Sequence, residues 1–195
     1  MSERSLTVAV VDPSRARAAI VEEGLRISGV ETVVVIPDTA GLFERLVSVD
    51  PDVVVIDLES PGRDLLEEMF QLSRSIDRPV AIFVDRSDAA TIAAAVEAGV
   101  SAYVVDGLEP KRVGSIVELA ISRFNAQGRL RRELSDAKNE LARRKLVERA
   151  KGVLMKAKGI PEDEAYALLR RTAMNEKRKI SEIAQALITS ADLLG

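Results

Sequence analysis

Four aspartates are the residues of this chain best suited to chemistry, because each lies at or just after the end of a short apolar run. They are Asp12, Asp57, Asp85 and Asp106. Carboxylates gathered in one place can bind a divalent cation. The chain has no histidine and no cysteine, which removes the commonest general base and excludes thiol nucleophiles and Cys-ligated metals. Since there is no phosphate-binding loop either, the acidic cluster is the single candidate catalytic site, and we expect no enzyme.

Basic residues form a second set suited to chemistry, and they lie in the last third of the chain. Residues 1–125 carry 12 Lys and Arg against 21 Asp and Glu, whereas residues 126–195 carry 16 against 10. Such a segment can neutralise the phosphates of a nucleic acid, although a merely solvated charged helix is the alternative. Tyr166, the one aromatic residue there, either stacks on an unpaired base or fills a small core. The candidate RNA contacts are Arg149, Lys151, Lys156, Lys158, Tyr166, Arg170, Arg171, Lys177, Arg178 and Lys179.

Five short apolar strands must position the aspartates. The strands are expected at residues 6–11, 32–36, 52–58, 79–84 and 102–105, with helices between them. Strands that are apolar on both faces are typical of a parallel sheet buried between layers of helices. Five such units predict a doubly wound α/β fold, in which ligands bind at the carboxyl ends of the strands. We therefore expect Asp12, Asp57 and Asp106 to form one acidic pocket.

Residues 6–123 resemble a response-regulator receiver domain, which is flavodoxin-like in fold. Asp57 matches the phosphoacceptor aspartate of that family, with Pro61 four residues later. Asp12 matches one of the acidic residues that hold Mg²⁺, so the resemblance implies a possible Mg²⁺ at Asp12 and Asp57. A carboxylate nucleophile needs such a cation to bring in a phosphoryl donor. We expect no other cofactor.

The match to the receiver family departs at three positions. Val11 stands where a second carboxylate is usual, Val84 where a hydroxyl is expected, and Asp106 where a lysine is expected. The lysine and the hydroxyl bind phosphoryl oxygens in the family and convert the added charge into a shape change. Val84 cannot donate a hydrogen bond, and Asp106 would repel a phosphate. These departures favour a pseudo-receiver, with a phosphorylatable domain as the alternative.

A long helix is expected after the receiver, because no proline occurs between Pro110 and about Lys158. Its apolar residues repeat at steps of four and three, flanked by charged residues, which indicates a coiled coil and a homodimer. The alternative is an amphipathic helix that packs on its own chain. The seam residues are Leu130, Leu134, Ala137 and Leu141.

Three helices are expected from residue 147 on. The first ends at Gly159, Pro161 opens the second in its first turn, and a charged turn at 175–179 precedes the third. This stretch resembles the ANTAR domain, an RNA-binding module of transcription antiterminators. The domains are therefore expected at 1–123 (receiver-like), 124–146 (coiled-coil linker) and 147–195 (ANTAR). The matching residues are Ala150, Lys151, Gly152, Leu154, Met155, Gly159, Glu164, Ala165, Tyr166, Leu169, Arg170, Ala173, Met174, Ile183 and Ala184.

The whole layout resembles the antitermination regulators of nitrate assimilation. The segments FVDRSD (83–88) and AGVSAYVVDGLEP (98–110) are similar to that group in particular. A related group with the same layout leaves the inducer open. The resemblance implies a dimer that binds paired stem-loops in a leader RNA. It also implies an inhibitory partner, a nitrate- or nitrite-sensing protein like the periplasmic binding proteins.

Other partners and locations are less favoured by the sequence. KISEIAQAL looks like the start of a helix-turn-helix, but the eight residues after Leu187 are too few for a turn and a recognition helix, so we expect no DNA binding. No apolar run approaches the roughly 20 residues that span a bilayer. The start MSERSLTV lacks a signal-peptide pattern, so we expect a cytoplasmic protein. A phosphorylation-activated regulator with the same RNA-binding output, or a dimeric adaptor that binds no nucleic acid, remain as alternatives.

Overall fold

The computed structural model describes residues 6–194. The chain divides into two compact units, one ending at Gly128 and the other beginning at Arg129. This boundary falls inside helix α5 (Pro110–Lys158), a few residues beyond the expected end of the receiver at residue 123. Within residues 6–194, no helix is long and apolar enough to span a membrane.

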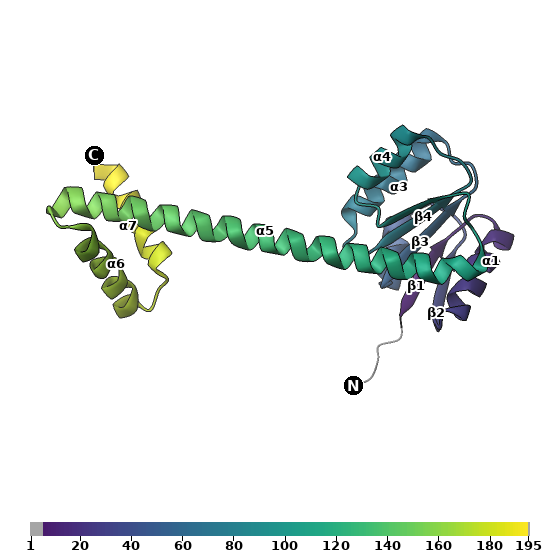
Figure 1. Ribbon diagram of the computed structural model, residues 1–195, viewed down its shortest axis with the longest axis horizontal. Coiled ribbons are helices and arrows are strands. Elements are labelled where there is room, and N and C mark those ends of the chain that lie inside the picture. The colour runs from purple at the N-terminus through teal and green to yellow at the C-terminus, as the bar shows by residue number, and fades with distance from the viewer. Residues whose placement is uncertain (1–5, 195) are drawn as a thin grey trace. The chain divides into compact units, whose positions relative to one another are not determined.

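The first unit is built on a five-stranded, all-parallel sheet, as the sequence predicted (Figure 1). The strand order is β2-β1-β3-β4-β5, so the chain winds outward from β1 in both directions. The apolar runs form these strands because both of their faces are covered by helices. The strands are β1 (Thr7–Val11), β2 (Thr32–Ile36), β3 (Val53–Leu58), β4 (Val80–Val84) and β5 (Ala102–Val105).

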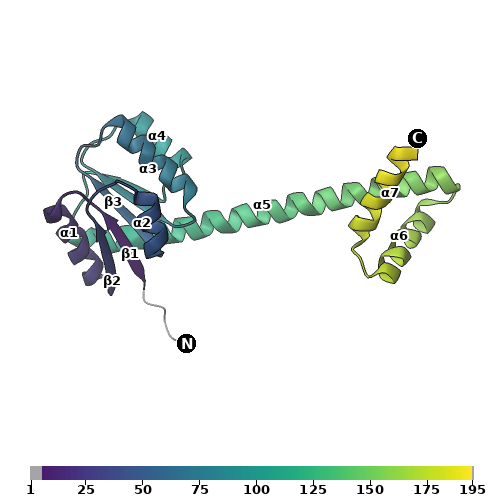
Figure 2. The same ribbon diagram turned by 180° about the vertical axis from the view of Figure 1, so that it is seen from behind.

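Two helical layers cover the sheet and divide its core in two (Figures 1 and 2). Helices α2 (Leu42–Val49), α3 (Arg63–Ser75) and α4 (Ala89–Glu97) bury one face. Helix α1 (Arg15–Ile27) and the first part of α5 bury the other. Neighbouring residues of β3 enter opposite cores, Val53 and Val55 one and Val54 and Ile56 the other, which is the period-2 alternation of a strand.

Helices α1 and α5 approach closely because two glycines face each other's helix. A Cβ on Gly24 would lie 2.7 Å from Cβ of Val113, and one on Gly114 would lie 2.7 Å from Oγ of Ser28. Both distances are too short for real side chains. The α5 segment is thus fixed against the receiver by backbone-level packing.

Aromatic residues contribute little to the first unit's core. Tyr103 on β5 packs edge-on against Phe70, with ring centroids 6.4 Å apart. Its hydroxyl forms a hydrogen bond of 3.1 Å with the Ser87 hydroxyl. The rest of the core is almost entirely aliphatic, as expected from a chain with 3% aromatic residues.

The second unit is a three-helix bundle formed by the end of α5, α6 (Glu162–Glu176) and α7 (Ile180–Leu194). Gly159 adopts a left-handed conformation (φ 67°) and ends α5, as its position predicted. Pro161 is the residue that caps α6, not its first helical residue as expected. Acidic residues fill the first turn of α6, where the helix dipole favours negative charge. The buried core is Ala150, Leu154, Ala165, Leu169, Ala173, Ile183, Ala184 and Ile188.

Candidate functional site

The strand register brings two of the predicted aspartates together. Val11 of β1 pairs with Ile56 of β3, so the next residues, Asp12 and Asp57, lie side by side at the carboxyl ends of these neighbouring strands. Both side chains are buried, Asp57 at 0% and Asp12 at 2% exposure. Asp85 follows β4 next to them and is half-buried. Three carboxylates thus lie together at the carboxyl ends of β1, β3 and β4.

Arg17 lies inside this pocket, which the sequence did not predict. Its Nε donates to Asp57 Oδ2 at 2.8 Å, and its Nη2 donates to Asp57 Oδ1 at 2.7 Å. Its remaining nitrogen, Nη1, lies 2.9 Å from Asp85 Oδ1. A guanidinium presents a planar fork that matches both oxygens of one carboxylate. One cation thus binds both oxygens of Asp57 and one oxygen of Asp85.

The turn before α1 aims Arg17 at the strand ends. Asp12 accepts a hydrogen bond from the Ser14 amide at 2.7 Å, and Ser14 caps α1 by accepting one from the Arg17 amide at 3.5 Å. Arg17 therefore stands in the first turn of the helix. Side chains on a helix lean toward its N-terminus, which here is the side of the pocket.

Burial and charge shift two pKa values in the pocket. Burial raises the pKa of Asp12 to about 6, with a further rise from Asp57; the Ser14 amide and Arg17 act in the opposite direction. Oδ2 of Asp12 is buried without a hydrogen-bond partner among the described residues. The pKa of Arg17 is raised, chiefly by its hydrogen bonds to Asp57.

Asp106 does not join the pocket as expected. It is exposed and adopts a left-handed conformation (φ 50°) in the turn after β5. Its amide donates to the Val84 carbonyl at 2.9 Å, but its carboxylate has no hydrogen bond or ion pair to Arg17, the cation of the pocket, in the described part of the chain. The pocket is therefore Asp12, Asp57 and Asp85 around Arg17. Val84 is buried at 2% exposure and supplies no polar group.

The residues of the pocket do not fit the Mg²⁺ that the receiver resemblance implied at Asp12 and Asp57. Both oxygens of Asp57 already accept hydrogen bonds from Arg17. Across residues 6–194, no group of three or more His, Cys, Asp or Glu side chains is arranged to hold a metal ion. A metal would have to compete with a bidentate guanidinium for Asp57.

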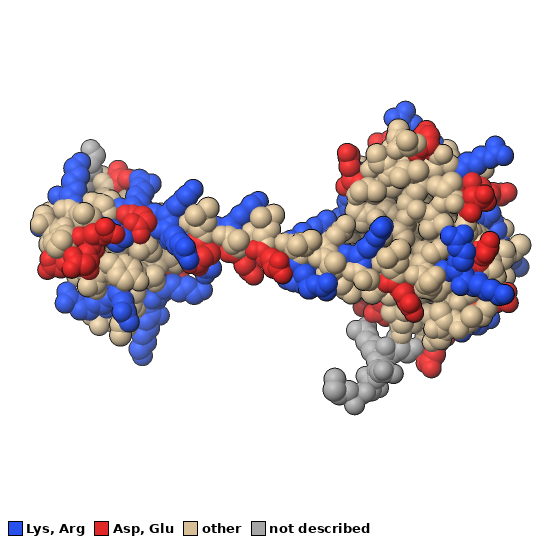
Figure 3. All heavy atoms as spheres, viewed as in Figure 1, with Lys and Arg blue, Asp and Glu red and all other residues tan. Residues whose placement is uncertain are grey.

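The predicted RNA contacts lie on the second unit, where basic side chains cover much of the surface (Figure 3). Two of the candidates are engaged in exposed ion pairs, Arg149 with Asp192 at 2.9 Å and Arg178 with Glu176 and Glu182 at 3.3 Å. The others of this group are exposed without a recorded ion pair within residues 6–194. They are Lys156, Lys158, Arg170, Arg171, Lys177 and Lys179.

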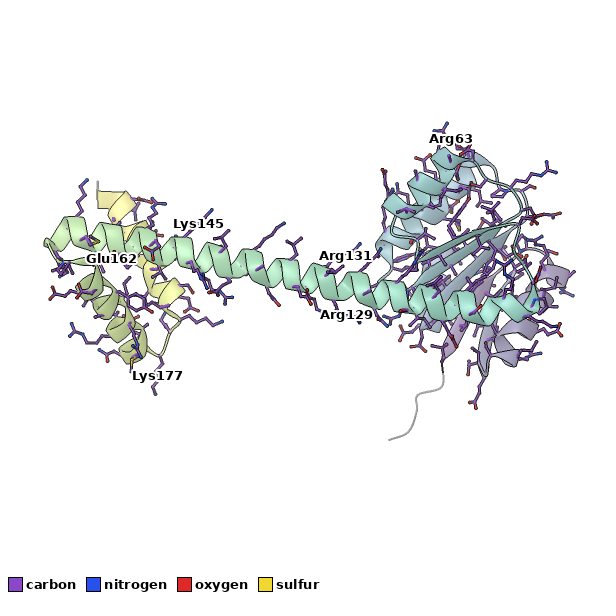
Figure 4. The ribbon with its side chains drawn as sticks, viewed as in Figure 1. Arg63, Arg129, Arg131, Lys145, Glu162 and Lys177 are labelled. Atoms are coloured by element: carbon purple, nitrogen blue, oxygen red, sulfur yellow. The ribbon has the colours of Figure 1, made fainter. Side chains whose placement is uncertain are left out.

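Lys151 differs from the other predicted contacts because it is buried, at 7% exposure. Its Nζ lies 2.7 Å from Glu148 on the same helix and 2.5 Å from Glu162. Glu162 stands at the start of α6 (Figure 4). Hydrogen bonds to Glu148 and then to Glu162 raise the pKa of Lys151. The geometry gives Lys151 a structural role, in which it joins α5 to α6.

A groove beside Tyr166 brings an aromatic ring and three cations together. Its volume is about 550 Å³. Tyr166 is 46% exposed, so its ring does not fill the bundle core, which was one of the two predicted roles. Arg143 and Arg144 were missing from the predicted contacts, although they lie four and three residues before Val147 on one helical face. The groove is lined by Glu140, Arg143, Arg144, Val147, Glu148, Tyr166, Lys179, Ile180 and Ser181.

The first unit has a doubly wound parallel sheet with a buried aspartate near the end of its third strand, the arrangement expected of a receiver domain, and solved structures agree. A response regulator from Thermotoga maritima superposes with a TM-score of 0.52 at 27% identity, covering 61% of this chain and 99% of that one. The receiver domain of the putative response regulator NarL from Mycobacterium tuberculosis gives a TM-score of 0.50 at 20% identity, covering 60% and 97%. The first unit therefore has the receiver fold.

The second unit assigns the chain to a family. Residues 135–188 match the ANTAR domain. The transcriptional regulatory protein PdtaR of Mycobacterium tuberculosis (strain ATCC 25618 / H37Rv) is 30% identical over 166 residues, 85% of this chain and 81% of that protein. The nitrate regulatory protein of Klebsiella oxytoca is 44% identical over 57 residues, 29% of this chain and 14% of that protein. The chain belongs to the ANTAR-domain response regulators, whose members are regulatory proteins.

Proposed function

We propose that this protein binds stem-loops in a nascent leader transcript and so lets RNA polymerase read into the operon downstream. The observation that carries the proposal is the basic groove beside Tyr166, in a unit that matches the RNA-binding ANTAR domain. Such a regulator acts where transcripts are made, in the cytoplasm.

The groove suits an unpaired nucleotide of an RNA loop. The exposed ring of Tyr166 offers a stacking surface for a base. Arg143, Arg144 and Lys179 line the same groove and can neutralise the adjoining phosphates. Glu140 on the rim holds the two arginines near the groove, since it lies 3.2 Å from Arg144 and 3.5 Å from Arg143. This combination favours a looped single strand over a uniform duplex.

Electrophoretic shift with the operon's leader RNA tests this function. Tyr166→Ala should weaken binding by about five- to 150-fold, because stacking one base contributes roughly 1–3 kcal/mol. Arg144→Ala should lower the slope of log Kd against log salt concentration by about one unit, which corresponds to the loss of one phosphate contact. Arg131→Ala, an exposed α5 change outside the groove, is the matched control. Wild-type affinity and salt dependence in both groove variants would contradict the assignment.

A homodimer would present two such grooves to paired stem-loops. Leu130, Leu134 and Leu141 on α5 are 65%, 56% and 54% exposed, and Ala137 between them is exposed as well. Exposed leucines repeating at coiled-coil spacing support a second copy of the same helix as their partner. The dimer rests on this apolar seam.

The receiver would act as a docking surface for an inhibitory sensor of nitrate or nitrite. The similarity to the nitrate regulatory protein of Klebsiella oxytoca, though confined to 57 residues, supports this inducer. A groove of about 570 Å³ between α3 and α4, lined by Arg63, Leu66, Phe70 and Arg86 among others, is a surface such a partner can bind. Adding the candidate sensor to the RNA shift assay should reduce binding, and nitrate or nitrite should restore it. Arg63→Glu should abolish the inhibition.

A further inference from the structure

We propose that Arg17 is a built-in cation of the receiver pocket, which takes the place of a divalent metal and closes Asp57 to phosphoryl transfer. The proposal is independent of RNA binding. It concerns a residue that neither the receiver motif nor the ANTAR match assigns.

The hydrogen bonds of Asp57 carry the first step. Both of its oxygens accept from Arg17, at 2.7 and 2.8 Å, and the carboxylate is fully buried. An aspartate that attacks a phosphoryl donor needs one oxygen free for the phosphorus and a cation that bridges it to the donor. In this pocket each oxygen already accepts an N–H of Arg17, so a phosphoryl donor and its cation must compete with the guanidinium for Asp57.

The charges around Arg17 hold it in place. Its third contact, to Asp85 at 2.9 Å, ties the end of β4 to the same guanidinium, and its side chain is only 19% exposed. Removing it would leave the Asp57 carboxylate buried without a counter-ion, which is strongly unfavourable. A metal ion must therefore displace Arg17 from both Asp57 and Asp85 before it can reach Asp57.

The departures from the receiver motif agree with a cation supplied from α1. The lysine expected after β5 is replaced by the exposed Asp106, and the hydroxyl expected at the end of β4 is replaced by the buried Val84. No positive charge thus comes from the usual end of the sheet. Arg17 provides one from the opposite side of the pocket, and the Asp12–Ser14 hydrogen bond fixes the turn that directs it.

The experiment measures Mg²⁺ binding and phosphorylation in the full chain. The wild type should show no Mg²⁺-dependent rise in Tm and no added phosphate by intact mass after incubation with acetyl phosphate and Mg²⁺. Arg17→Ala should gain both. In the gained reaction an Asp57 oxygen forms a bond to phosphorus while the bond between phosphorus and the acetate oxygen breaks, and acetate leaves. The added phosphate should therefore be absent from the double variant Arg17→Ala/Asp57→Asn.

Two further variants keep the test decisive. Arg15→Ala changes an exposed arginine two residues before Arg17 in the same helical turn and should behave as the wild type. Arg17→Gln, a neutral side chain that retains a donor to Asp57, replaces Arg17→Ala if the latter does not fold. Labelling of the wild type at Asp57, or no gain of Mg²⁺ binding in either Arg17 variant, would overturn the proposal.

Discussion

Replacing Asp57 with asparagine should destabilise the receiver, because it removes the charge that pairs with Arg17. Each charge-assisted hydrogen bond contributes about 1.5–3 kcal/mol. An asparagine keeps one acceptor oxygen but turns an N–H₂ toward the other guanidinium donor. The loss is therefore about one such bond plus the cost of a poorly paired arginine, roughly 3 kcal/mol in total.

Calorimetry of the full chain measures this loss as a shift of the receiver transition. At about 2 cal/mol/K of unfolding entropy per residue, 3 kcal/mol over a unit ending at Gly128 corresponds to a Tm lowered by roughly 10 °C. Asp85→Asn is the matched control, because Asp85 is 40% exposed and makes one ion pair to Arg17. Its Tm should fall by about 3 °C or less.

The sign of the Asp57→Asn effect distinguishes two pockets. In a pocket of carboxylates without a counter-ion, removing one charge relieves repulsion and stabilises the fold. A raised or unchanged Tm in Asp57→Asn would therefore refute the pairing with Arg17. RNA affinity should stay at the wild-type level in this variant, since the groove beside Tyr166 belongs to the other unit.

Three further predictions concern single features of the two units. Because burial raises the folded-state pKa of Asp12 to about 6, the folded chain binds more protons than the unfolded chain between about pH 4 and 6, so stability falls as pH rises through that window. At pH 7 the charged Asp12 carboxylate destabilises the fold by roughly 3 kcal/mol, so Asp12→Asn should raise the Tm there. Below about pH 4, where Asp12 is protonated in both states, the wild type and the variant should melt at the same temperature. Leu130→Asp/Leu134→Asp should convert a dimer to a monomer in sedimentation, because a carboxylate in an apolar seam is costly to desolvate; an unchanged mass, or a monomeric wild type, contradicts the seam. Lys151→Ala should lower the Tm of the second unit, whereas the exposed Lys156→Ala should leave it unchanged, and equal melts for the two would show that the Glu148–Lys151–Glu162 bonds are not formed.

The fold was predictable because its signals are local. Five apolar runs with helices between them gave the receiver sheet and its order of elements, and Gly159 marked the end of α5. Apolar residues at helical spacing predicted the bundle core, because the helices that carry Leu169 and Ile183 are apolar on one face only. Two of the pocket's carboxylates followed from the rule that ligand-binding side chains gather at the carboxyl ends of parallel strands.

The pairing of the pocket was not predictable from the same signals. Arg17 and Asp57 are 40 residues apart, and an arginine in the first turn of an amphipathic helix looks like any solvated side chain. Asp106 is exposed in a turn with a left-handed backbone angle, which the Asp-Gly sequence permits but does not impose. The burial of Lys151 was not predictable for a similar reason, because its partner Glu162 belongs to the next helix.

The scarcity of aromatic residues gives each unit its own optical probe. The chain has no tryptophan and two tyrosines, Tyr103 in the receiver and Tyr166 in the groove of the ANTAR unit. Tyrosine emission in a Tyr103→Phe variant would therefore come from the ring in the groove alone, and in a Tyr166→Phe variant from the receiver alone. Quenching by a stacked base could be followed in the first variant, and movement of the Ser87–Tyr103 contact on partner binding in the second, without attaching any dye.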